Sequence, residues 1–171
     1  LTALISTGCA SFDPKSEDPV EVLSRAPDDL VDWTAKGKAS FTYQGVTEAA
    51  RFYWARSTLH DDAITLSGPF SMNRQTIERR DDQLIWRDGD QGRPLSDLGP
   101  GSPALIALTA IPPDALGRWL LGAQPDSSVW EVDVSEWQVA PPWQAPSRVT
   151  IHGTGIEIKV IISQWEFSPE P

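Results

Sequence analysis

The sequence predicts one α+β domain in which helices are inserted between two groups of antiparallel strands, and three features support this. Short segments in which apolar and polar residues alternate fill much of residues 35–88, with short turns between them. Residues 102–110 and 113–121 instead carry one apolar face at helical spacing. Alternation resumes at residue 130 and continues almost to the end of the chain. Strands, a helical insertion and further strands are typical of an α+β fold.

The first group of strands begins with a predicted hairpin. Small or aromatic side chains alternate with polar ones from Ala35 to Tyr43, so one face of this strand is expected to be buried. Gln44-Gly45 supplies a turn, and residues 50–54 alternate again as the second arm. Before this hairpin, residues 20–33 place apolar side chains among acidic ones and predict one or two short helices. Three further strands are predicted at residues 63–67, 74–80 and 83–88.

The second helix of the insertion has clear start and stop signals. Pro113 suits a first helical turn, and Gly122 suits the position just after a helix. Between them, Leu116, Trp119 and Leu120 follow the i, i+3, i+4 spacing of one helix face. The second group of strands is predicted at residues 130–134, 148–152 and 156–163.

The N-terminus predicts a lipid anchor. Residues 1–8 are apolar or small and precede Cys9, the single cysteine, as at the end of a lipoprotein signal peptide. In this interpretation residues 1–8 are a signal-peptide remnant, Cys9 is acylated and residues 9–19 are a flexible tether. Residues 20–171 then form the single domain. The alternative is a free cysteine buried behind a short apolar strand.

Charge and motif content argue against several classes of function. The net charge of -10 argues against a nucleic-acid partner, and also against docking on an anionic membrane through a basic face. No catalytic motif or pair of metal ligands at helical spacing is present in the sequence, so we expect no enzyme, no cofactor and no metal site. His60 beside Asp61 and Asp62 is compatible with a metal role, but a solvated turn between strands is the preferred interpretation.

Two apolar features call for explanation. The sequence contains eight tryptophans, an unusually high number for a domain of this size. Their rings suit either a packed core or an apolar ligand site, and the periodicity does not separate the two. The second feature is Gly68-Pro69, which breaks the third strand before Phe70 and Met72. Phe70 either folds back into the core or serves as a wedge that enters lipid.

Six features that together span nearly the whole domain carry a resemblance to a known family. They are Cys9 with its preceding residues, Trp33 to Phe41, Ala50 to Trp54, Leu66 to Phe70, Leu116 to Gly122, and Ile156 to Trp165. In order and spacing they resemble the LolB family of outer-membrane receptors in the bacterial lipoprotein-sorting pathway. The resemblance implies an incomplete (half) antiparallel β-barrel with helices over its opening. It also implies an apolar cavity for acyl chains and a protruding loop that promotes insertion.

The resemblance also names candidate residues. The membrane-insertion loop would contain Pro69, Phe70 and Met72, with Phe70 at the position where family members usually have leucine. Gln124 before Pro125 is a second departure, because the family more often has an apolar residue there. The candidates for the acyl cavity are Phe41, Phe52, Trp54, Leu66, Leu116, Trp119, Leu120, Ile158 and Val160.

By this resemblance the protein is expected to be a monomeric receptor on the periplasmic face of the outer membrane, anchored through Cys9. It would take cargo lipoproteins from a soluble, LolA-like periplasmic carrier, bind their acyl chains and insert them into outer-membrane lipid. Two alternatives stay open. One is a soluble LolA-like carrier, which would lack the lipidated cysteine and the wedge. The other is a non-catalytic structural or assembly lipoprotein in which the cavity is merely a packed core.

Overall fold

The computed structural model describes residues 23–68, 74–99 and 101–168. In these ranges nine strands form one antiparallel sheet in the order β6-β5-β4-β3-β2-β1-β9-β8-β7. The strands are β1 Trp33–Tyr43, β2 Val46–Arg56, β3 Asp61–Ser67, β4 Gln75–Arg80, β5 Gln83–Asp88, β6 Gln91–Pro94, β7 Glu131–Ala140, β8 Trp143–Gly153 and β9 Ile156–Phe167. The helical elements are a 3-10 turn, Leu95–Asp97, and the helices α1 Pro103–Ala110 and α2 Ala115–Leu120.

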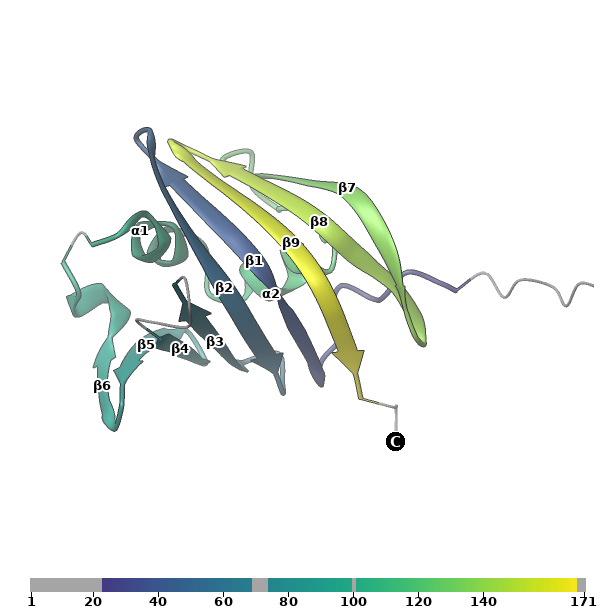
Figure 1. Ribbon diagram of the computed structural model, residues 1–171, viewed down its shortest axis with the longest axis horizontal. Helices are drawn as coiled ribbons and strands as arrows, with labels where there is room; N and C mark the ends of the chain where they lie inside the picture. The colour runs from purple at the N-terminus through teal and green to yellow at the C-terminus, as the bar shows by residue number, and fades with distance from the viewer. Residues whose placement is uncertain (1–22, 69–73, 100, 169–171) are drawn as a thin grey trace, which may run out of the picture.

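The sheet is curved and open. The central strand β1 pairs along its whole length with β2 on one side and with β9 on the other. The end strands β6 and β7 each have a single neighbour, so the barrel is incomplete. Figure 1 shows α1 and α2 on one side of the sheet, with α2 behind β1 and β9. The predicted α+β fold with helices over a curved antiparallel sheet is confirmed.

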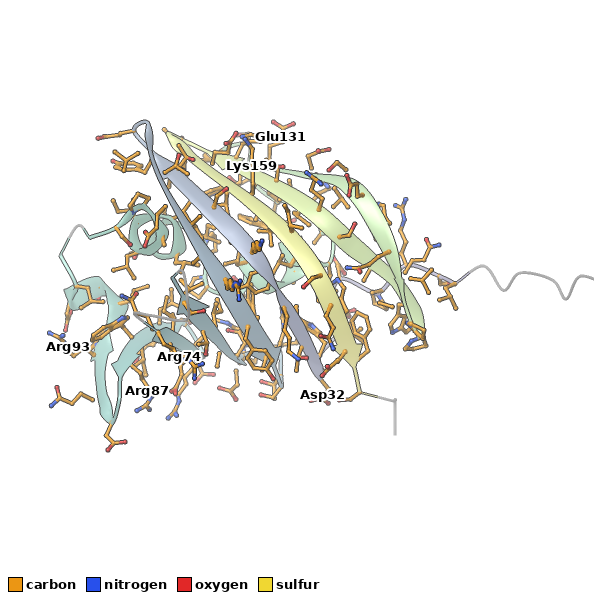
Figure 2. The ribbon with its side chains drawn as sticks, in the orientation of Figure 1. Asp32, Arg74, Arg87, Arg93, Glu131 and Lys159 are labelled. Atoms are coloured by element: carbon orange, nitrogen blue, oxygen red, sulfur yellow. The ribbon has the colours of Figure 1, made fainter. Side chains whose placement is uncertain are left out.

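The core lies between the concave face of the sheet and the helices, and tryptophans form its centre. Trp33 is only 2% exposed, and its ring centroid lies 5.6 Å from that of Trp54 and 5.2 Å from that of Trp165. Such tilted and edge-on pairs stabilise a core beyond the area that they bury. Most charged side chains lie at the periphery, as Figure 2 shows for Asp32 and Glu131, whereas Arg56, Asp62 and Arg79 are buried.

The predicted helices over residues 20–33 are wrong for the part that the structure describes. Residues 23–32 contain no helix: Arg25 forms an isolated parallel bridge to Gln144 of β8, and residues 28–29 form a turn. The backbone N–H of Ala26 donates to the carbonyl of Gln144 at 2.9 Å, and the N–H of Gln144 donates to the carbonyl of Ser24 at 2.8 Å. Pro27 disfavours a helix here, and pairing with the strand satisfies the backbone instead.

The other boundaries mostly follow the predictions; one strand is new, and β2, β7, β8 and β9 extend beyond their predicted ranges. Both predicted helices form, and Gly122, with φ of +100°, ends α2 as expected. β6 was not predicted, because residues 88–92 carry strong turn signals; the tight turn at Gly89 leads directly into it. β7 and β8 are both longer than their alternation indicated. His60 lies in an exposed bend between β2 and β3, as the preferred interpretation required.

Candidate functional site

An apolar cavity lies between the concave face of the sheet and the two helices. The sheet contributes residues from β1, β2, β3 and β9, and the cover comes from α1 and α2. Its volume is about 30 Å³, which is room for little more than one water molecule. Every side chain that lines it is apolar: Ala39, Phe41, Phe52, Trp54, Ile64, Leu66, Leu108, Leu116, Leu120, Ile158 and Val160.

The local sequence explains why these side chains converge. Ala39 and Phe41 are two residues apart on β1, so both point to the concave face, and Ile158 and Val160 do the same on β9. The register places Phe41 opposite Ile158 and Ala39 opposite Val160. The small side chain of Ala39 leaves space at the centre of this floor. Leucines of α1 and α2 close the cavity from above.

Eight of the nine candidate cavity residues line this space. Trp119 does not; it is 4% exposed and packs against Trp130, with ring centroids 5.5 Å apart. Sequence reasoning missed Ala39, Ile64 and Leu108. The first two continue the alternation of their strands, and that signal was sufficient to find them. The single apolar face predicted for residues 102–110 is wrong, because α1 is apolar on nearly every side and Thr109 is its one polar side chain; the sequence therefore did not indicate which face would meet the sheet.

Few polar contacts hold the helices over the cavity. The backbone N–H of Ala104, in the first turn of α1, donates to Oε2 of Glu48 on β2 at 3.3 Å. Arg118 of α2 pairs with Asp28 at 3.2 Å, and both side chains are more than a third exposed. Exposed pairs of this kind contribute about 0–1 kcal/mol. Apolar packing therefore contributes most of the free energy that keeps α2 against the sheet.

A buried arginine with two unpartnered guanidinium nitrogens lies beneath α2. Arg56 is 2% exposed, and neither its Nε nor its Nη1 has a partner among the described residues. Burial lowers the pKa of its guanidinium, and nearby Asp62 offsets this only in part. Nη1 packs directly against the backbone at Gly117, where any side chain would overlap it. A buried donor without an acceptor costs free energy, so this contact between α2 and the sheet is a weak point.

Beside Arg56 lies a buried ion pair. Nε and Nη2 of Arg79 donate to Oδ2 of Asp62 at 3.2 and 2.8 Å, and Nη2 also donates to the carbonyl of Leu59 at 2.7 Å. The two side chains are 1% and 4% exposed. Burial raises the pKa of the Asp62 carboxyl, and the hydrogen bonds from Arg79 offset part of that rise.

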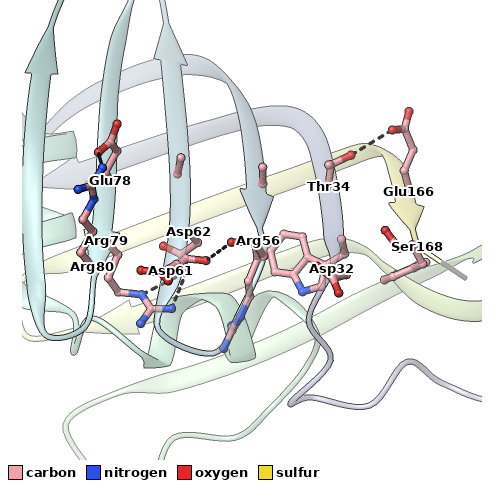
Figure 3. Close-up of a pocket in the computed structure, with 15 residues that line it drawn as sticks. Asp32, Thr34, Arg56, Asp61, Asp62, Glu78, Arg79, Arg80, Glu166 and Ser168 are labelled. Atoms are coloured by element: carbon pink, nitrogen blue, oxygen red, sulfur yellow. Dashed lines mark hydrogen bonds and ion pairs between the residues drawn. The ribbon is translucent and has the colours of Figure 1, made fainter. Parts of the chain in front are cut away.

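A second hollow is much larger than the apolar cavity. It is an open, charged groove of about 930 Å³ at the ends of β1, β2, β3, β4 and β9 (Figure 3). Carboxylates and arginines alternate along it, and neither histidine is among its lining residues. Across residues 23–68, 74–99 and 101–168, no three potential metal ligands come together. At one end of the groove the Thr34 hydroxyl donates to Oε2 of Glu166 at 3.2 Å, an exposed contact.

A comparison with models of known protein families identifies the family of this chain. The model described as outer membrane lipoprotein LolB matches residues 31–129, which include β1 to β6, α1 and α2. The chain belongs to the LolB family. A curated relative, the outer-membrane lipoprotein LolB of Halorhodospira halophila, is 26% identical over 194 residues, covering 99% of this chain and 94% of the relative. The resemblance found in the sequence is confirmed.

Solved structures support the fold of this LolB-family chain. A LolA superfamily protein from Nitrosomonas europaea superposes with a TM-score of 0.54 at 11% identity, covering 86% of this chain and 90% of that one. A DUF1329 family protein from Desulfovibrio piger gives a TM-score of 0.52 at 9% identity, covering 82% and 88%. At these identities the likeness concerns the fold alone.

Two predicted features lie outside the described residues. They are the N-terminal anchor at Cys9 with residues 1–8 and 9–19, and the insertion loop with Pro69, Phe70 and Met72. The loop joins β3, which ends at Ser67, to its neighbour β4, which begins at Gln75. Neither α1 nor α2 has the length and apolar character that a membrane crossing requires.

Proposed function

We propose that the protein is an outer-membrane receptor that accepts lipoproteins from a periplasmic carrier by binding their acyl chains and inserts them into the membrane. Membership of the LolB family and the name of the Halorhodospira halophila relative support the lipoprotein and outer-membrane parts of this proposal. The observation that carries the acyl-binding part is the wholly apolar cavity between sheet and helices. A wholly apolar wall suits a hydrocarbon chain, with about 0.8 kcal/mol for each CH₂ kept from water.

Acyl binding requires the helices to move. A cavity of about 30 Å³ is far too small for a fatty acyl chain, so α1, α2 or both must shift away from the sheet. The contacts described above favour such a shift, because the ion pair of Arg118 is exposed and Arg56 lacks partners beneath α2. Opening would let water reach the Arg56 guanidinium, which offsets part of the cost of exposing leucines.

The first test is acyl binding by the chain and by a variant of the cavity wall. Leu116→Gln places an amide in the wall at a partly exposed position of α2, where the fold should tolerate it. We expect its affinity for a fluorescent fatty acyl probe to fall at least about fivefold, since one unpaired amide costs at least about 1 kcal/mol. Leu105→Gln is the matched control, because Leu105 is also a partly buried leucine of a covering helix but does not line the cavity. Equal affinity for both variants would count against acyl binding at this site.

The second test concerns membrane insertion. We expect Phe70→Glu to leave cargo uptake from a loaded carrier unchanged and to lower transfer into outer-membrane vesicles about tenfold, since a carboxylate resists entry into lipid. Transfer of a radiolabelled lipoprotein measures both steps. Val46→Glu is the control, because Val46 is 61% exposed in the β1–β2 hairpin and is not one of the residues of the proposed loop. Normal transfer by Phe70→Glu would remove the wedge from the proposal.

The lipid anchor at Cys9 completes the proposal. A single acyl chain holds a protein on a membrane only marginally, so a stable anchor requires at least two chains. With such an anchor the receptor stays at the destination membrane while the carrier remains mobile, which separates the proposed receptor from a soluble LolA-like carrier. Mass spectrometry of the protein extracted from its own membranes tests the modification directly.

A further inference from the structure

The convex face of the sheet, opposite the acyl cavity, carries a shallow groove over β1, β2, β3 and β9. Its volume is about 590 Å³. Except for Phe52, which belongs to the core and also lines the apolar cavity, the side chains that line the groove alternate along the strands with those of the core, so they point away from the helices. They are mainly polar or basic, and the groove is lined by Lys36, Gly37, Lys38, Arg51, Phe52, Tyr53, Thr65, Ser67, Arg74, Ile161 and Ser163.

A β-bulge lies at this groove, where β1 pairs with β9. Lys36 pairs with Gln164 and Gly37 pairs with Ile162, so Ser163 is an extra residue on β9. A side chain at residue 37 would overlap the backbone carbonyl of Ile161 and press on the ring of Phe52. Glycine is therefore required where the two backbones approach each other.

Four cations gather at this groove: Lys36, Lys38, Arg51 and Arg74. Lys38 and Arg51 face each other directly across β1 and β2, an arrangement that destabilises a sheet. Lys36 pairs with Glu166 at 3.5 Å, whereas Lys38, Arg51 and Arg74 have no carboxylate partner among the described residues. The fold thus holds like charges together without neutralising them.

Other cations of the same face are neutralised. Arg80, Arg148 and Lys159 each pair with a glutamate, at 3.2, 3.1 and 2.8 Å. Figure 2 shows Arg74 beside β3 and β4, far from Lys159 at the opposite end of the sheet. In a chain of net charge -10, an unpaired basic cluster is a local exception that the net charge conceals.

We propose that this convex cationic patch, Lys36, Lys38, Arg51 and Arg74, docks the domain on the phosphate groups of an anionic phospholipid surface. Exposed Tyr53 and Ile161, at 41% and 47%, add the aromatic and apolar contacts typical of a membrane interface. The inference rests on the proposed function and deepens it by naming the lipid that the receptor meets.

The position of the patch favours lipid over a protein partner. A carrier that hands over acyl chains must reach the helix-covered side of the sheet, whereas the patch faces the opposite way. Arg74 also directly follows residues 69–73, the segment proposed to enter lipid. Cations beside that segment would bring it to the bilayer and hold it there.

The test compares two charge-neutralised variants of the unacylated chain, both carrying Cys9→Ala so that the anchor does not contribute. The patch variant is Lys38→Gln, Arg51→Gln, Arg74→Gln. The control, Arg80→Gln, Arg148→Gln, Lys159→Gln, removes the same charge from the same face. Each is sedimented with vesicles of phosphatidylcholine alone or mixed with phosphatidylglycerol. Each basic residue near an anionic surface tightens binding about fivefold, so we expect the patch variant alone to lose at least about tenfold on the mixed vesicles.

Three results would overturn the proposal. They are equal binding to neutral and anionic vesicles, an equal loss in both variants, and a patch variant that binds vesicles normally but a soluble acidic carrier weakly. Binding of the fatty acyl probe is measured in parallel and should be the same for both variants and the unsubstituted chain. Failure of the chain to bind the probe would contradict the proposed acyl-binding function. The sedimentation experiment would still test the lipid-docking proposal, because it does not depend on binding of the acyl probe.

Discussion

Asp62→Ala should lower the free energy of unfolding by about 3–5 kcal/mol, because it leaves a buried cation without its partner. Asp62 and Arg79 are almost completely buried and share two hydrogen bonds through Oδ2 of Asp62. Removing the carboxylate would also take away the negative charge that most offsets the burial of Arg56, whose guanidinium already lacks partners. Urea unfolding followed by tryptophan fluorescence measures the change.

Two further variants make this prediction specific. Asp61→Ala changes the adjacent, exposed carboxylate on β3 and should alter stability by less than about 1 kcal/mol. The double variant Asp62→Leu, Arg79→Met replaces both charges by apolar side chains and should recover most of the loss. If Asp62→Ala unfolds at the urea concentration of the unsubstituted chain, the pair does not stabilise the fold.

Gly117→Ala should destabilise the closed domain by about 3 kcal/mol, at the upper end of the range for overpacking. The added methyl would overlap Nη1 of Arg56 and crowd its Cζ at 3.2 Å. Arg56 is 2% exposed, so relieving this overlap must either displace its side chain toward the charged groove that it also lines or lift α2 from the sheet. Because α2 covers the cavity, the same variant should take up a fatty acyl probe faster than the unsubstituted chain.

A double-mutant cycle with Arg56→Met separates this contact from a general effect on the helix. Methionine is shorter and has no donor to satisfy, so Arg56→Met alone should leave stability unchanged or raise it by about 1–3 kcal/mol. In that background Gly117→Ala should cost much less, which gives a coupling energy of about 2 kcal/mol. Additive effects would show that the methyl acts only within α2 and that Arg56 does not link the helix to the sheet.

Local sequence patterns were enough to predict the fold class and most of the cavity floor. A period of two assigns each strand residue to one face, so the alternation alone places Phe41, Phe52 and Trp54 in the core, where they are buried. The end of α2 before Gly122 followed from a local backbone preference, whereas the predicted start at Pro113 lies two residues before the helix begins at Ala115. The helices expected over residues 20–33 failed because pairing with β8 outweighed a weak local pattern.

Features that depend on residues far apart in the chain were set by the tertiary packing and could not be predicted. Trp119 shares a helical face with Leu116 in the pattern, yet the docking of α2 turns its ring onto Trp130. The bulge at Gly37 and the strand register bring Lys38, Arg51 and Arg74 to one groove, although the sequence shows no basic run there. Sequence periodicity assigns a side chain to a face, whereas register and curvature determine its neighbours on that face.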